Sequence, residues 1–80
     1  MENVYTTKNL NIAAFLYASN LQLIRTERIN REVFFHFTPK EKAESLVEAY
    51  FVGSAVINPR DLFARLKDLK DLIFSGGKYA

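Results

Sequence analysis

Hydrophobic residues recur every three or four positions in three segments of the chain, and this spacing predicts three amphipathic helices. The first helix is expected from Lys8 to Ser19. The second is expected to follow Thr38 and stop at Gly53, and the third to begin after Asn58. The apolar residues on the inward faces are Leu10, Ala13, Ala14 and Tyr17 in the first helix, Ala43, Leu46, Val47 and Tyr50 in the second, and Leu62, Leu66, Leu69 and Ile73 in the third.

Residues that favour helix ends support these three segments. Thr38 stands directly before Pro39 and three residues before Glu41, which is the pattern of a capping box with proline at the first helical position. Residues 6–7 are both threonine and are suited to cap the first helix, and Asn58 is suited to cap the third. The residues suited to the left-handed conformation at helix ends and turns are Asn20, Asn30 and Gly53.

Two runs between the first and second helices, 21–26 and 32–37, have the β-branched and aromatic composition of strands. A short polar connection separates them, so they are expected to form an antiparallel hairpin. The residues expected on the core face are Leu21, Leu23, Val33, Phe35 and Phe37, and those on the outer face are Gln22, Ile24, Thr26, Phe34 and His36. Residues 55–57 precede a proline in an extended stretch and are a candidate for a third short strand.

These elements predict a small α+β domain of order α-β-β-α-α, in which three helices cover an antiparallel hairpin. A chain of 80 residues is expected to form a single domain over residues 1–80, with an ordered core at about residues 5–75 and a tail at 76–80. A two-stranded ribbon is marginally stable in water, so packing against the helices is expected to stabilise it.

Composition and charge exclude several classes of protein. Apolar residues make up 49% of the chain and charged residues 25%, which is typical of a globular domain and not of a disordered one. The formal charge of +2 is too small for a protein that coats nucleic acid by charge alone. The chain has no cysteine and no apolar run long enough to span a membrane, and a cytoplasmic location is therefore expected.

No group of residues in the sequence is typical of a catalytic, cofactor or metal site. His36 is the only histidine, and its neighbours in the strand are Phe35 and Phe37, so it is expected to have a structural role on the outer face. One histidine without cysteine does not form a usual transition-metal site. The glycine pair at 76–77 follows a helix instead of preceding one, so it is not a phosphate-binding loop. We therefore expect no enzymatic activity and no cofactor.

More large apolar side chains are present than three short helices are expected to cover. This surplus predicts a binding or regulatory protein that recognises another protein, or a second copy of itself as a homodimer. An arrangement in which one subunit covers these residues is the competing interpretation. The residues predicted to form the protein interface are Ile12, Phe15, Ile24, Phe34 and His36.

The hairpin also permits a second function, the binding of single-stranded nucleic acid. Arg25, Arg28 and Arg31 surround the predicted turn and could hold phosphates, while Phe34 could stack on a base. Glu27 and Glu32 lie in the same stretch and reduce its positive charge. Nucleic-acid binding is therefore the alternative to protein recognition.

Several motifs together resemble an uncharacterised family of short bacterial and phage domains, and the similarity extends from Val4 to Phe74. The resemblance implies a product of a bacterium or a mobile element. It transfers no catalytic or binding residue, because that family has no assigned activity. The segments that carry it are Tyr5–Leu10, Ala13–Leu16, the aromatic strand, Ala49–Gly53, Asn58–Pro59, Leu62–Phe63 and Leu66–Lys70.

Overall fold

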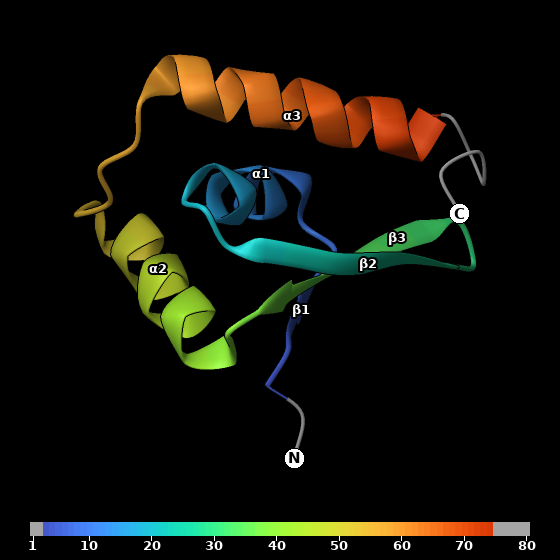
Figure 1. Ribbon diagram of the computed structural model, residues 1–80, viewed down its shortest axis with the longest axis horizontal. Helices are drawn as coiled ribbons and strands as arrows, with labels where there is room; N and C mark the ends of the chain where they lie inside the picture. The colour runs from blue at the N-terminus through green and yellow to red at the C-terminus, as the bar shows by residue number, and fades with distance from the viewer. Residues whose placement is uncertain (1–2, 75–80) are drawn as a thin grey trace.

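A three-stranded antiparallel sheet and three helices form the domain in the computed structural model, which describes residues 3–74 (Figure 1). Helix α1 lies between the sheet and α3, and α2 closes one end of the molecule. The predicted α+β class with three helices is therefore confirmed, and the predicted tail at 76–80 lies outside the described residues. The elements in chain order are β1 (Tyr5–Thr7), α1 (Leu10–Ala18), β2 (Gln22–Ile29), β3 (Glu32–Thr38), α2 (Lys40–Val52) and α3 (Pro59–Phe74).

The hairpin of β2 and β3 is longer and its turn tighter than the sequence predicted. Strand β2 continues to Ile29, and β3 begins at Glu32. The two residues between them, Asn30 and Arg31, both have positive φ angles, of 51° and 72°. A two-residue turn of this kind matches the right-handed twist of the strands, and asparagine adopts it readily. Arginine was not an obvious candidate for a positive φ, so the predicted connection was too long.

The third strand of the sheet is β1, and residues 55–57 form no strand. Strand β1 pairs with β3 so that Tyr5 lies opposite Phe37 and Thr7 opposite Phe35, giving the order β1-β3-β2. The partners are some 30 residues apart in the chain, and no local pattern announces such a pairing. In the 55–57 segment the backbone N–H of Ala55 instead donates to the carbonyl of Ala49 at the end of α2.

An irregularity at Ile24 changes which face of the sheet each residue of β2 occupies. Leu23 lies opposite Phe37, but the next paired residue is Arg25, opposite His36. Ile24 is therefore the extra residue of a β-bulge, which shifts the alternation by one position. The prediction that Thr26 lies on the outer face is wrong. Its partner in the register is the buried Phe35, so Thr26 belongs to the inner face.

Helix α1 is apolar on nearly all sides because it lies between two layers. Ile12 and Phe15, which fall outside its predicted stripe, retain only 3% and 1% of their surface exposed. A helix packed on one side only would have left them in water, whereas one covered by both the sheet and α3 buries them. The fully assembled core comprises Ile12, Ala13, Ala14, Phe15, Leu16, Leu21, Phe35, Phe37, Ala43 and Leu69.

The side chains that cap the helices differ from the predicted ones in two of three cases. Asn9 caps α1, since its Oδ1 accepts the N–H of Ile12 at 3.0 Å. At the start of α2, Thr38 donates its hydroxyl to the carbonyl of Asn3, and the Oδ1 of Asn3 accepts the N–H of Lys40. The expected capping box is thus replaced by a residue from the N-terminal segment. Asn58 caps α3 as predicted, through the N–H of Arg60.

Candidate functional site

A row of three polar side chains crosses the outer face of the sheet. The row consists of Thr6, His36 and Glu27. In the register, Thr6 and Arg25 lie on either side of His36, and Glu27 follows two residues after Arg25. The hydroxyl of Thr6 lies 2.9 Å from His36 Nδ1, and Glu27 Oε1 lies 3.0 Å from His36 Nε2. His36 is only 7% exposed. Each strand of the sheet contributes one member of the row.

The order hydroxyl, imidazole, carboxylate resembles that of a nucleophile, its base and an orienting group. Chemistry of that kind also requires a hollow for the substrate and donors for an oxyanion. Three hollows of about 260, 260 and 280 Å³ lie beside α3, and neither Thr6 nor His36 lines any of them. With both ring nitrogens of His36 in hydrogen bonds, the row joins the three strands of the sheet.

The three arginines of the hairpin do not share one face. Arg25 lies on the outer face, opposite His36. Arg28 lies opposite Val33 on the inner side and donates to the carbonyl of Ile73 at 2.9 Å, so it links the hairpin to α3. Arg31 occupies the turn and lines one of the hollows. The structure thus separates the cations that the sequence grouped for nucleic-acid binding.

The charges of Arg25 and Glu27 cancel on the outer face of the sheet. Phe34 lies there, half-buried, opposite Glu27. Lys8 forms an ion pair of 2.8 Å with Glu32, and both line a hollow with the inward-facing Val33. Phe34 and His36 are therefore on the predicted outer face, but their surroundings offer no excess positive charge to a phosphate backbone.

Exposed apolar side chains gather at the end of the molecule where α2 passes into the linker to α3. We call Tyr50, Phe51, Val52 and Val56 the α2-end surface. Phe51 and Val52 are 71% and 70% exposed, and Val56 is 95% exposed. In Figure 1 the last turn of α2 and the linker form the end of the domain opposite the hairpin turn.

This surface was not among the predicted interface residues, although the sequence contains a signal for it. Tyr50, Phe51 and Val52 are three consecutive apolar residues, and a helix that packs on one side cannot bury all three. Tyr50 makes a ring contact with Phe15, at 5.3 Å between centroids, and Phe51 packs on the outer edge of Tyr50. Of the predicted interface residues, Ile24 is exposed at the bulge, whereas Ile12 and Phe15 belong to the core.

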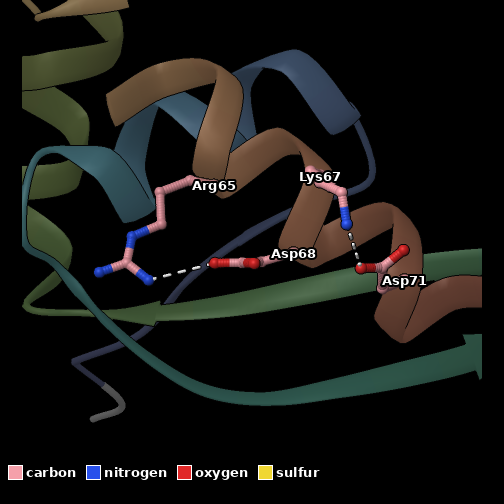
Figure 2. A network of polar contacts seen from close by, with 4 residues as sticks. All are labelled: Arg65, Lys67, Asp68 and Asp71. Carbon is pink, nitrogen blue, oxygen red and sulfur yellow. Dashed lines mark hydrogen bonds and ion pairs between the residues drawn. The ribbon is translucent and has the colours of Figure 1, made fainter. Parts of the chain in front are cut away.

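Charged residues of α3 pair along the helix surface, as Figure 2 shows. Arg65 lies 3.3 Å from Asp68, and Lys67 lies 3.4 Å from Asp71. The guanidinium of Arg65 also lies over the ring of Tyr17, 4.4 Å from its centroid. Ion pairs as exposed as these contribute little to stability. Their main effect is on the distribution of charge over the surface of α3.

The described residues contain neither a metal-binding group nor a membrane-spanning helix. Within residues 3–74, no three side chains of the metal-binding types lie close enough together to hold an ion. Over the same residues, no helix has both the length and the apolar character of a membrane span.

The chain belongs to a family of small domains whose role has not been assigned. A family model described as a domain of unknown function, DUF5659, matches residues 2–75. The predicted resemblance to an uncharacterised family of short domains is therefore confirmed. No curated protein matches the chain. No solved structure matches it either.

Proposed function

We propose that this domain is a non-enzymatic binding protein that recognises other protein surfaces and associates with a second copy of itself through the α2-end surface. The observation that carries the proposal is the exposure of Phe51, Val52 and Val56 at one end of the domain. Isolated apolar side chains are common on protein surfaces, but several of them at one end of a domain are typical of an interaction site.

The size of this surface fits a small interface. The four side chains expose on the order of 500 Å², comparable to the largest apolar patch of a typical monomer, which is often functional. Two such surfaces face to face bury about 1,000 Å², the lower bound for a specific interface. Burial of this area gives a driving force for association that the sheet face, with its paired charges, does not offer.

A second copy is the favoured partner because this part of the chain contains no charge. The eleven residues from Ala49 to Pro59 include no Asp, Glu, Lys or Arg. In a two-fold symmetric dimer each patch meets the same patch of the other copy, and like charges at its centre would repel. An uncharged patch avoids this repulsion, and a larger protein partner remains the other outcome of the test.

The cellular location and the origin of the domain are part of the same proposal. A chain without cysteine forms no disulfide, which is consistent with a role in the cytoplasm of a bacterium or in the life cycle of a phage or other mobile element. Nucleic-acid binding through the hairpin has less support, because Arg28 is engaged with Ile73 and acidic side chains accompany Arg25.

Light scattering or sedimentation at tens of micromolar tests the self-association. We expect a dimer for the natural sequence and a monomer for Val56→Asp, because a carboxylate at a site that is 95% exposed affects association without disturbing the fold. The matched control is Ile29→Asp, which places the same charge on an exposed apolar residue at the hairpin end.

A monomeric natural protein would overturn the self-association, as would a dimer that Val56→Asp leaves intact. Dissociation by Ile29→Asp alone would move the interface to the hairpin. Circular dichroism of each variant establishes that the fold is retained.

A further inference from the structure

Six of the seven charged residues of α3 form two rows along the helix, and Arg65 lies outside both. Arg60, Lys67 and Lys70 are spaced by seven and three residues, which places them on one side of the helix. Three aspartates follow the same spacing one residue later, and therefore lie about 100° further around the axis. These aspartates are Asp61, Asp68 and Asp71.

The aspartate row is directed toward α1 and β2. Asp61 lines a hollow together with Asn20, and Asp68 and Asp71 line another together with Leu23. The basic row lies on the other flank of α3. Among the described residues, only Lys67 of this row lies within 4.0 Å of a carboxylate, that of Asp71 at 3.4 Å (Figure 2).

Two exposed aromatic rings belong to the same flank as the basic row. Phe63 and Phe74 continue its spacing, and they are 66% and 83% exposed. We call the set Arg60, Phe63, Lys67, Lys70 and Phe74 the α3 basic–aromatic row. It places three cations and two rings along about 21 Å of helix, the length of on the order of four nucleotides.

We propose that the α3 basic–aromatic row binds single-stranded nucleic acid. Its three cations hold phosphates, and the rings of Phe63 and Phe74 stack on bases. This surface is separate from the α2-end surface and from the hairpin, so the proposal does not depend on self-association.

The arrangement favours nucleic acid over the two other partners that a basic helix can attract. A helix that lies in a membrane surface inserts its apolar face into lipid. The apolar face of α3 packs against the core, with Leu69 buried, and two separate rings offer little area for insertion. An acidic peptide would engage the cations alone, whereas bases have flat faces that stack on exposed rings.

Fluorescence anisotropy with a labelled oligothymidylate tests the proposal across a range of salt concentrations. For three phosphate contacts on a single strand, the logarithm of the binding constant should fall with the logarithm of salt at a slope of about −2. The double variant Lys67→Glu/Lys70→Glu should bind about tenfold more weakly or worse, with a slope nearer −1. Lys40→Glu/Lys42→Glu on α2 makes the same change in net charge and should bind like the natural protein.

The variant Phe63→Leu separates stacking from simple apolar contact, because it keeps an apolar side chain but removes the ring. We expect its affinity for the oligonucleotide to fall about fivefold or more. The proposal is overturned if binding does not depend on salt, or if the two double variants bind equally. It is also overturned if Phe63→Leu binds normally. Equal binding of polyglutamate, or of vesicles containing phosphatidylserine, would assign the row to an acidic protein or to a membrane instead.

Discussion

His36 Nε2 lies 3.0 Å from Glu27 Oε1, and this contact joins the central strand of the sheet to β2 across the outer face. The other ring nitrogen of the same imidazole contacts Thr6 of β1. A short edge strand of three residues is therefore held by side-chain bonds as well as by its backbone ladder. The imidazole therefore links β1 and β2 to the central strand.

Removal of the imidazole by His36→Ala is expected to destabilise the domain by roughly 1–3 kcal/mol, because it leaves the site without either hydrogen bond and opens a gap in the outer face. Urea unfolding followed by circular dichroism measures this. Glu32→Ala is the matched control, since it removes an exposed ion pair with Lys8 and should cost less than about 1 kcal/mol. Equal effects of the two substitutions would contradict the role given to His36.

The cap of α2 by Asn3 predicts an effect of a residue far from that helix in sequence. Asn3→Ala removes the acceptor for the N–H of Lys40 and should lower the free energy of unfolding by about 1 kcal/mol. Asn3→Asp keeps an acceptor and adds a negative charge near the helix N-terminus, so it should retain stability. Thermal and urea unfolding of both variants test this, and a loss of stability in Asn3→Asp equal to that in Asn3→Ala would exclude the cap.

Gly53 ends α2 with a φ of 80°, and an added Cβ would meet no atom within 4 Å. Gly53→Ala should therefore cost about 1–2 kcal/mol through backbone strain alone, without a steric clash. Gly53→Asn should cost less, because asparagine tolerates the left-handed conformation. The urea midpoints of the two variants measure this difference. An asparagine variant less stable than the alanine variant would contradict the role given to the positive φ at Gly53.

Truncation of two phenylalanines, one buried and one exposed, should lower the free energy of unfolding by different amounts. Phe37 is fully buried between the sheet and the helices, and Phe37→Ala should cost about 3–5 kcal/mol, most of the stability expected for a domain of this length. Phe51→Ala should cost less than about 1.5 kcal/mol, since only its edge contact with Tyr50 is lost. Comparable losses would mean that Phe51 is covered within one subunit.

Local signals in the sequence were sufficient for the helices and the hairpin. Gly53 and Asn58 mark one end each of α2 and α3, and both perform the expected task in the structure. Asn20 and Asn30 adopt the expected positive φ. Each of these features depends on residues that are neighbours in the sequence, so a local pattern is sufficient to predict it.

Features that depend on distant residues were not predictable in this way. Strand β1 exists because Tyr5 meets Phe37, and α2 is capped by Asn3 because β1 brings that residue to its start. Phe15 is buried because α1 has neighbours on two sides, which a helical stripe cannot indicate. The exposed α2-end surface follows from the same cause, since the contacts within one subunit determine which of three consecutive apolar residues are left in water.

The β-bulge at Ile24 also affects how copies of this domain can meet. Strand β2 is an outer strand of the sheet, and its free backbone edge is eight residues long. A straight edge of that length invites another chain to add a strand, and repetition of this step produces fibrils. The bulge bends the edge, and Arg25, Glu27 and Arg28 place charges along it. Growth of one continuous sheet through many molecules is thereby disfavoured.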